Sequence, residues 1–242
     1  MNILIIGYGI VGHNLAKELE PLTPDVYDKY KEVFAPQKKD IKYDIAFVCV
    51  DTPTESCDIT EVINAIQEND AAIYVIKSTI LPGTTEKLGY LLNKKIIFSP
   101  EYYGGTQHCN NFDFNFTILG GEKDYCIKVQ QALQHCYDAR HTFRIVDSKT
   151  AELVKYMENS WLATKVSFCH QFYDIANQAG VDYEELRELF ILDPRVNPSH
   201  TFVYRDYDYW DSHCFNKDVP AIANAYDAEL LKAVIEFNKR RK

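Results

Sequence analysis

The stretch "SHCFNKD", residues 212–218, brings together a thiol, a cation and a carboxylate in Cys214, Lys217 and Asp218. A cysteine thiolate is a nucleophile that can add to a carbonyl carbon and hold the product covalently. A cysteine taken alone is more often a small buried hydrophobe than a reactive group. The neighbouring lysine and aspartate favour the nucleophile, and the buried thiol remains the alternative.

A second polar pair falls within a long stretch that has a helical pattern. Lys155 and Asn159 are four residues apart, a spacing that places both on one face of a helix. A cation beside an amide can stabilise the alkoxide that forms as a hydride departs. The alternative is that both are ordinary solvated side chains.

A glycine turn stands near the start of the chain, between an apolar run and a helical pattern. The run "NILII" at 2–6 fits a buried strand, and Gly7, Gly9 and Gly12 after it form G-x-G-x-x-G. The first glycine permits a tight bend, and the second lets the backbone approach a pyrophosphate. The third allows the helix to pack closely on the strand. The pattern indicates a dinucleotide-binding turn.

The residues around this turn complete the predicted cofactor site. The helix that starts at Ile10 and Val11 would offer backbone N–H groups to an anion. Asp28 follows Gly7 by about 20 residues, where a carboxylate accepts hydrogen bonds from an adenosine ribose. Because Asp28 would repel a 2′-phosphate, NAD is the predicted cofactor. The alternative is a glycine turn with a surface aspartate beside it.

The elements that position these residues alternate between apolar runs and helical segments in the first part of the chain. After residues 2–6, runs typical of buried strands recur at 44–50, 72–76, 95–99, 116–120 and 142–146. A capping box of Asp58 and Glu61 predicts the start of one intervening helix. The alternation predicts an α/β doubly wound sheet, and we assign residues 1–147 to an NAD-binding domain.

Near residue 148 the pattern changes to helices alone. About thirty residues from Thr150 contain no proline and end at Gly180, where a helix C-cap is expected. Residues 193–213 are predicted to form a loop, and residues 218–238 a closing helix. We therefore predict an all-α domain at 148–242 that begins on one long connecting helix and carries Cys214.

Composition limits the partners, the location and the cysteine chemistry that we expect for this protein. The net charge of −9 and the pI of about 5.3 argue against nucleic acid as a partner, and the basic end "NKRRK" is predicted to be a solvated tail. The lack of a signal peptide or an apolar run of about 18 residues predicts a cytoplasmic protein that does not enter a membrane. Seven cysteines without a C-x-x-C pair suggest neither a disulfide framework nor a metal site.

Seven motifs in order resemble those of the UDP-glucose and GDP-mannose dehydrogenase family, over nearly the whole chain. They are "GYGIVG", "CVDTPT", "STILPGTT", "SPEYY", "TAELVKYMENSWLATKVSF", "DPRV" and "CFNKD". The resemblance implies a Rossmann-like NAD domain, a helical domain that dimerises through its long helix, and a C-terminal domain that binds the nucleotide sugar. It also implies oxidation of the sugar's primary alcohol to a carboxylate with two NAD, in nucleotide-sugar metabolism and polysaccharide biosynthesis.

The resemblance also implies catalytic roles for particular residues. Cys214 would hold the aldehyde as a thiohemiacetal until a second hydride leaves. Lys155 and Asn159 would stabilise the alkoxide, and Asp218 would position a water molecule together with Thr79.

Glu101 would act as the general base on the water that releases the acid, with an exposed loop glutamate as the alternative. Arg195 would reach the substrate of a neighbouring subunit, or would simply be solvated. The substrate contacts implied are Glu101, Tyr102, Lys155, Asn159 and Arg195. Thr52, Thr79 and Lys217 would join the glycine turn in binding the cofactor.

The chain also departs from the family pattern near the substrate. A second loop carboxylate of the family is replaced by Gly105, and Asn216 replaces a proline. Tyr207, Tyr209 and Trp210 replace a glycine-rich approach to the cysteine, so they would occupy space beside the sugar.

The sequence ends before the C-terminal nucleotide-sugar-binding domain that the family carries, so we expect either a fragment or a short natural form. The favoured function is NAD-dependent oxidation of a nucleotide sugar, with UDP-glucose giving UDP-glucuronate. One alternative is a catalytically impaired NAD-binding dimer that acts as an interaction or regulatory subunit. Another is a dehydrogenase for a smaller hydroxy acid, which would not need the thiol.

Overall fold

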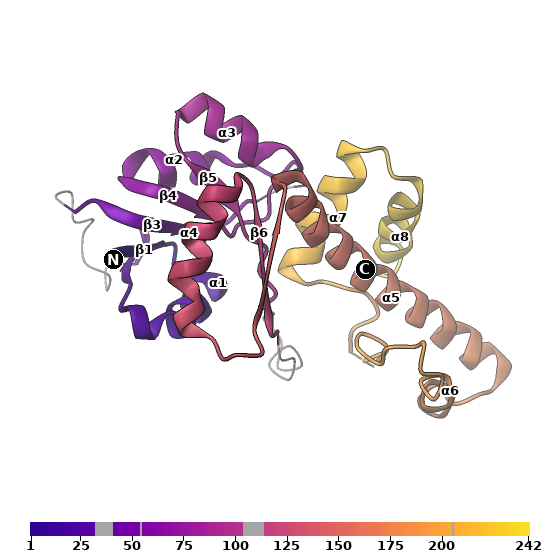
Figure 1. Cartoon of the computed structure of the whole chain (residues 1–242). Helices are drawn as coiled ribbons and strands as arrows, with labels where there is room; N and C mark the ends of the chain where they lie inside the picture. The colour runs from indigo at the N-terminus through magenta and orange to yellow at the C-terminus, as the bar shows by residue number, and fades with distance from the viewer. Residues whose placement is uncertain (32–40, 54, 104–113, 205) are drawn as a thin grey trace. The chain divides into compact units, whose positions relative to one another are not determined.

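The computed structural model describes residues 1–31, 41–53, 55–103, 114–204 and 206–242 (Figure 1). The chain separates into two compact units. The first consists of residues 1–53 and 57–155, and the second chiefly of residues 156–242. Gly105, which replaces the family's second loop carboxylate, and Cys109, one of the seven cysteines, lie outside the described residues.

The first unit is built on a mixed sheet in the strand order β2-β1-β3-β4-β5-β6-β7. Neighbouring strands are parallel except for the antiparallel pair β5 and β6. The strands are β1 (Ile3–Ile6), β2 (Asp25–Tyr27), β3 (Tyr43–Val48), β4 (Ala71–Ile76), β5 (Ile96–Phe98), β6 (Phe116–Gly120) and β7 (Thr142–Val146). All of them match predicted apolar runs except β2, which is three half-buried residues long and carries no apolar pattern.

Helices cover both faces of this sheet. Leu15 of α1 (Ile10–Glu18) and Val129 of α4 (Lys123–Leu133) pack with Phe47 on one face. Ile66 of α2 (Thr60–Glu68) and Leu88 of α3 (Thr84–Leu92) belong to the apolar cluster on the other face. Two short 3-10 helices, η1 (Glu20–Leu22) and η3 (Gln134–Cys136), follow α1 and α4. This layering confirms the predicted doubly wound α/β fold.

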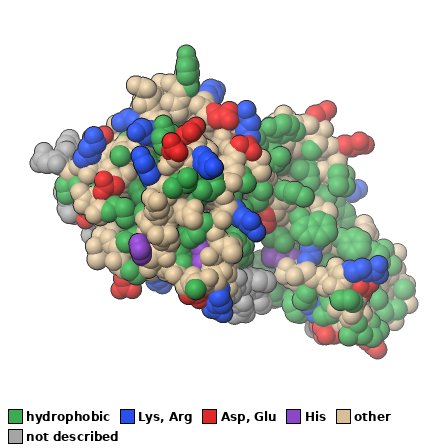
Figure 2. Space-filling view, in the orientation of Figure 1, with side chains coloured by type: hydrophobic (Ala, Val, Ile, Leu, Met, Phe, Trp, Pro, Cys, Tyr) green, Lys and Arg blue, Asp and Glu red, His purple; other side chains and the backbone are tan. Residues whose placement is uncertain are grey.

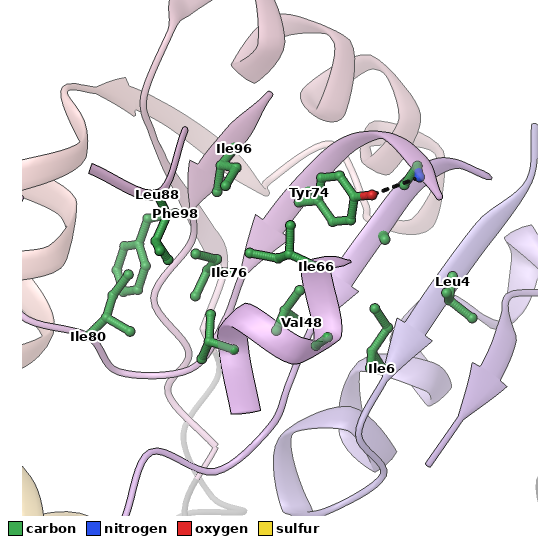
Figure 3. Packing of buried hydrophobic residues seen from close by; sticks show 14 of the residues in the cluster. Leu4, Ile6, Val48, Ile66, Tyr74, Ile76, Ile80, Leu88, Ile96 and Phe98 are labelled. Atoms are coloured by element: carbon green, nitrogen blue, oxygen red, sulfur yellow. Dashed lines mark hydrogen bonds between the residues drawn. The ribbon is translucent and has the colours of Figure 1, made fainter. Parts of the chain in front are cut away.

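Tyr74 shows how the core accommodates a polar group (Figure 3). Its side chain is fully buried among the apolar residues of β3, β4 and α2. The hydroxyl donates to the carbonyl of Asn69 at 2.5 Å and accepts from the amide of Ala71 at 3.0 Å. The buried phenol therefore keeps its hydrogen bonds, so its burial costs little stability.

The predicted capping box at the start of α2 is wrong. Asp58 accepts hydrogen bonds from the amide and hydroxyl of Thr60, at 2.9 and 2.6 Å. Its own amide donates to the carbonyl of Pro53 at 3.1 Å and not to the carboxylate of Glu61. The turn that precedes the helix, with Cys57 at φ +56°, places the Pro53 carbonyl as the acceptor for the Asp58 amide.

The second unit is all-α, as predicted. Helix α5 (Ser148–Ala179) is 32 residues long and ends at Gly180, whose φ of +68° suits a glycine C-cap. Helices α6 (Tyr183–Phe190), α7 (His213–Ala225) and α8 (Glu229–Lys239) follow. The single closing helix predicted at 218–238 is wrong, because Asp227 adopts φ +51° and separates α7 from α8. Aspartate tolerates this left-handed conformation better than most residues.

Two further expectations about the second unit, a Trp210 ring beside the sugar and a solvated basic end of the chain, are also wrong. Trp210 packs in the core with Phe215 and Val219, so its ring fills the interior of the unit. The end of the chain is held by contacts: Asn238 is buried, and Arg241 pairs with Asp174 of α5. Composition shows neither result, because both depend on contacts between distant segments.

None of the helices described here is both long enough and apolar enough to cross a membrane. Among the described residues, no group of His, Cys, Asp and Glu side chains is placed to hold a metal ion. The six cysteines that the structure describes carry thiols and form no disulfide.

Glu152 connects the first turns of α5 to the start of α3. The side chain is fully buried, and burial raises the pKa of its carboxyl group. Its oxygens accept from the amides of Gly83 and Thr85, at 2.5 and 2.8 Å, and from the Thr85 hydroxyl at 2.6 Å. The N-terminus of α3 is therefore capped by a side chain that lies almost 70 residues away in the sequence.

We predict that Glu152→Ala lowers the free energy of unfolding by about 3 kcal/mol, because two amides and a hydroxyl lose a buried acceptor. Urea denaturation would measure the change. Glu184→Ala, which removes an exposed acid from the first turn of α6, should change stability by less than about 0.5 kcal/mol. Equal losses in the two variants would contradict the role given to Glu152.

Candidate functional site

The glycine turn after β1 is shaped by backbone contacts. Gly7 has φ +91°, and a Cβ there would lie 2.6 Å from the carbonyl oxygen of Cys49. A Cβ on Gly12 would lie 1.9 Å from the carbonyl oxygen of Gly7. Around Gly9, by contrast, no atom of the described residues comes within 4 Å of the added Cβ, its own chain neighbours aside. The fold thus requires Gly7 and Gly12, whereas the open space at Gly9 suits a ligand that approaches the backbone.

The N-terminus of α1 faces this turn. Gly9 is the N-cap, no side chain caps the helix, and its first turn, with Ile10 and Val11, contains no acidic residue. The first amides of a helix have no partners within the helix, and they attract anions. Such an arrangement fits the pyrophosphate of a dinucleotide.

Asp28 directly follows β2, the strand that pairs with β1 in the sheet. One carboxylate oxygen accepts from the amide of Tyr8 at 2.7 Å, and the other from the amide of Tyr30 at 2.9 Å. The side chain is thereby tied to the glycine turn. A carboxylate offers about four lone-pair sites, so Asp28 keeps capacity for ribose hydroxyls.

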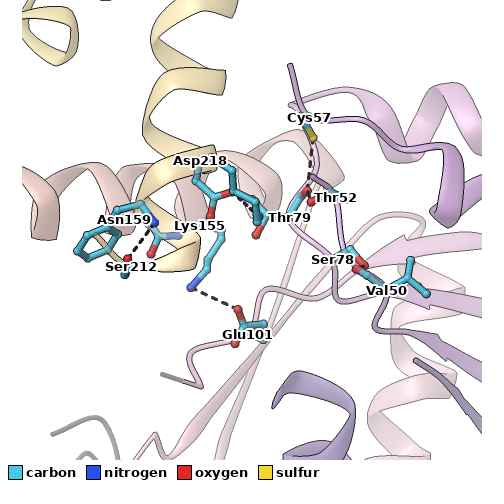
Figure 4. Close-up of polar contacts among 12 residues, drawn as sticks. Val50, Thr52, Cys57, Ser78, Thr79, Glu101, Lys155, Asn159, Ser212 and Asp218 are labelled. Atoms are coloured by element: carbon cyan, nitrogen blue, oxygen red, sulfur yellow. Dashed lines mark hydrogen bonds and ion pairs between the residues drawn. The ribbon is translucent and has the colours of Figure 1, made fainter. Parts of the chain in front are cut away.

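Thr52 and Thr79 follow β3 and β4, and they are in contact (Figure 4). The hydroxyl of Thr52, a side chain only 2% exposed, donates to the carbonyl of Thr79 at 2.8 Å. The Cys57 thiol donates to the same carbonyl at 3.5 Å. The structure therefore brings together two of the predicted cofactor residues at the carboxyl end of the parallel strands.

Glu101 and Lys155 form a buried ion pair within the first unit, as Figure 4 shows. The Lys155 Nζ lies 3.8 Å from the Glu101 Oε1, and both side chains are 6% exposed. The other Glu101 oxygen accepts from the amide of Tyr103 at 2.8 Å. The Lys155 ammonium also lies 5.2 Å from the ring centre of Tyr102. Glu101 is thus a buried, paired carboxylate, and the alternative of an exposed loop glutamate is wrong.

Lys77 was missed by the sequence analysis. It follows the apolar strand β4 directly and is almost fully buried, which lowers the pKa of its ammonium group. Its Nζ donates to the Ser99 hydroxyl and to the Pro100 carbonyl, both at 3.2 Å. Lys77 therefore holds the backbone immediately before Glu101. A lysine that ends an all-apolar run is the only signal that could have identified it.

The second unit holds a separate polar cluster around Asp218 on α7. The Asn159 amide donates to one carboxylate oxygen at 2.7 Å, and the Lys217 ammonium donates to the other at 2.6 Å. Asp218 and Asn159 are buried, and the Lys217 side chain is 14% exposed. Each oxygen of this buried carboxylate therefore has a hydrogen-bond donor, which offsets the cost of its burial.

Cys214 is the second residue of α7, four positions before Asp218. It is half-buried and packs against the apolar cluster that contains Phe215. Arg195 lies on the loop after α6. Its side chain is 87% exposed and pairs with Asp193 two residues away.

Two sequence models of one family match the chain. The model described as "UDP-glucose/GDP-mannose dehydrogenase family, NAD binding domain" matches residues 25–139, and the model of the family's central domain matches residues 149–240. The chain belongs to this family. The glycine turn lies before the matched residues 25–139, in the same compact unit.

Several curated proteins resemble this family member. The UDP-glucose 6-dehydrogenase of Rickettsia prowazekii is 28% identical over 82% of the chain and 50% of the relative. The UDP-N-acetyl-D-mannosamine dehydrogenase of Pyrococcus horikoshii is 27% identical over 97% of the chain and 63% of the relative. The chain spans about half the length of the first of these relatives.

Solved structures of dehydrogenases share the fold. A UDP-D-ManNAc dehydrogenase from Pyrococcus horikoshii aligns with a TM-score of 0.84 at 22% identity, over 100% of this chain and 69% of that one. A UDP-glucose dehydrogenase from Pyrobaculum islandicum gives 0.82 at 23% identity, over 99% and 68%. At these identities the likeness concerns the fold alone.

We predict that Gly9→Ala leaves the stability of this dehydrogenase family member within about 0.5 kcal/mol, because the fold has room for the methyl group. The same methyl group should weaken NAD binding by about tenfold or more, because it would stand where the pyrophosphate approaches the backbone. Calorimetric titration with NAD, together with thermal unfolding, would measure both effects.

Gly12→Ala is the matched control for Gly9→Ala. Its Cβ would lie 1.9 Å from the Gly7 carbonyl oxygen, so this variant should lose stability whether or not NAD is present. Undiminished NAD affinity in Gly9→Ala would contradict the binding site proposed at this turn.

Proposed function

We propose that the protein is an NAD-dependent nucleotide-sugar dehydrogenase that uses Cys214 to oxidise UDP-glucose to UDP-glucuronate. The observation that carries this proposal is the polar cluster around Asp218, on the helix α7 that bears the cysteine, in which Lys217 of α7 and Asn159 of α5 pair with the carboxylate. A structural cysteine needs no such neighbours, whereas a reaction that creates and removes charge does.

NAD would supply the chemistry of accepting hydride when it is bound. Asn159 can donate a hydrogen bond to the oxygen of a substrate alcohol as that oxygen gains negative charge. Lys155 can supply a positive charge to the same oxygen, and its pairing with Glu101 fixes the direction of its side chain. The Cys214 sulfur would add to the aldehyde carbon and keep the half-oxidised sugar on the protein.

Once a second hydride has left for a second NAD, the sugar would be held to Cys214 as a thioester, and its release as the acid would require water and a base. Glu101 can accept a proton from water through the oxygen that faces Lys155, while its other oxygen is held by the Tyr103 amide. We assign the orientation of this water to Asp218 and Thr79. Thr52, Thr79 and Lys217 are assigned to the cofactor, and Tyr102 and Arg195 to the substrate.

UDP-glucose is the proposed substrate because similar curated proteins are named UDP-glucose 6-dehydrogenase. UDP-N-acetyl-D-mannosamine is the second candidate, since similar proteins carry that name as well. The proposal places the activity in the cytoplasm, in the supply of sugar acids for polysaccharide biosynthesis.

We also propose that the protein is a homodimer formed through α5. This helix exposes an apolar stripe made of Met157, Trp161, Phe168, Phe172 and Ile175, each between 40% and 74% exposed. At about 100° per residue, these side chains fall within about 60° of one another around the helix. Figure 2 shows hydrophobic side chains at the surface in the region of α5 and α6. A second copy of the same helix would cover such a stripe.

The role of Cys214 predicts that Cys214→Ser loses turnover with NAD and UDP-glucose by about two orders of magnitude or more. The affinity for NAD should stay unchanged, because the glycine turn is intact. Cys136→Ser replaces another half-buried thiol and should keep both properties. Normal NADH production by Cys214→Ser would show that the thiol is not the nucleophile.

The dimer predicts that Trp161→Glu converts the protein to a monomer, because a charge would stand within an apolar interface. Sedimentation velocity would measure the change. Tyr90→Glu alters an even more exposed aromatic residue, on α3, and should leave the dimer intact. A monomeric wild-type protein, or a Trp161→Glu variant that remains a dimer, would rule out this interface.

A further inference from the structure

The segment that leads into Cys214 is tied to the last turn of α8. Trp210 stands four residues before the cysteine. Its amide donates to the side-chain oxygen of Asn238 at 2.8 Å, and its carbonyl accepts from the side-chain nitrogen of Asn238 at 3.0 Å. One buried amide side chain thus satisfies both polar groups of this backbone unit, as a neighbouring strand would.

The Trp210 ring is anchored as firmly as its backbone. Only 6% of the side chain is exposed, and the indole Nε1 donates to the Ser167 hydroxyl of α5 at 3.0 Å. The ring also meets Phe215 edge to face, with 6.2 Å between the ring centres. Phe215 directly follows Cys214, so the anchor contacts the chain on both sides of the thiol.

Arg241 adds a second tie two residues before the tryptophan. Its Nε donates to the carbonyl of Asp208 at 2.6 Å. The guanidinium also pairs with Asp174 of α5, and its Nη2 lies 3.1 Å from the Asp174 Oδ1. The Arg241 side chain is only 15% exposed. This residue, which follows α8, therefore joins the segment that leads into Cys214 to α5.

Local hydrogen bonds also hold the start of α7. The Ser212 hydroxyl caps the helix by accepting from the Phe215 amide at 3.0 Å. Asp211 accepts from the Asn216 side chain at 2.8 Å. Two short-range hydrogen bonds therefore span Cys214 at the start of α7. The long-range contacts of Trp210 hold the chain four residues before it.

We propose that Asn238, Arg241 and Trp210 are positioning residues that hold the first turn of α7 and thereby the direction of the Cys214 thiol. None of them needs to touch substrate or cofactor. The catalytic part of this inference rests on the proposed function of Cys214, whereas the anchor itself can be tested on the thiol alone.

The test uses the two tryptophans of the chain. In a Trp161→Phe background, Trp210 is the sole tryptophan and its emission reports on the anchor. Adding Asn238→Ala should shift this emission to the red as the ring gains water. Alkylation of Cys214 by iodoacetamide, followed by peptide mass spectrometry, should be about tenfold faster, because the segment opens more often without its hydrogen bonds.

Ser167→Ala removes only the indole contact and serves if Asn238→Ala does not fold; it should shift the same two signals by a smaller amount. Tyr183→Phe is the matched control. It removes one buried hydrogen bond of the same unit, from the Tyr183 hydroxyl to the Thr201 carbonyl, and should leave both signals unchanged. If the alkylation rates of the anchor variants equal that of Tyr183→Phe, the anchor does not position the thiol.

Turnover separates this inference from the proposed function. An active enzyme should lose kcat in Asn238→Ala with little change in KM, because the thiol is misplaced while the binding groups remain. Faster alkylation without NADH from any UDP-sugar in the parent protein would support the anchor and reject the proposed function. Unchanged alkylation in an active enzyme would reject the anchor alone.

Discussion

Burying ionisable side chains is the constraint on which the rest of this structure depends. An isolated charge taken out of water is strongly unfavourable, so each buried charge requires partners in a fixed place. Lys155 pairs with Glu101, Asp218 with Asn159 and Lys217, and Glu152 with the start of α3. Hydrophobic residues of similar size would often give equal or better stability. Such costly groups gather at functional sites, which is why we assign the Lys155 and Asp218 groups to chemistry, whereas Glu152 caps a helix.

Helix α5 supplies much of this paired set. Within the first unit it contributes Glu152 and Lys155. Within the second unit it contributes Asn159 to the Asp218 cluster and Ser167 to the Trp210 anchor. Its outward stripe is apolar. A single helix therefore serves polar contacts on some faces and a proposed protein interface on another.

The parts of the fold that the sequence predicted well are those set by local physics. The strands followed from apolar runs, and the turn at Gly7, Gly9 and Gly12 from its glycine spacing between a strand pattern and a helix pattern. The end of α5 followed from Gly180. Each of these signals is contained within a few neighbouring residues.

Several features that the sequence analysis missed have the opposite origin. The cap of α3 comes from Glu152, the environment of Trp210 from Asn238, and the buried state of Lys77 from a neighbouring strand end. No local pattern specifies these partners. The candidate site was predicted as a set of residue types, because the resemblance supplied the motifs. Its ion pairs and hydrogen bonds appeared only in the folded chain.

The central claim is that one protein carries a sugar alcohol through two oxidations while a thiol holds the intermediate. The most direct measurement is the number of NADH molecules formed for each UDP-glucose consumed, followed by absorbance and by quantification of the sugar. The account predicts about two NADH per sugar, with UDP-glucuronate as the product. One NADH per sugar with release of the aldehyde, or none with any UDP-sugar despite NAD binding, would contradict it.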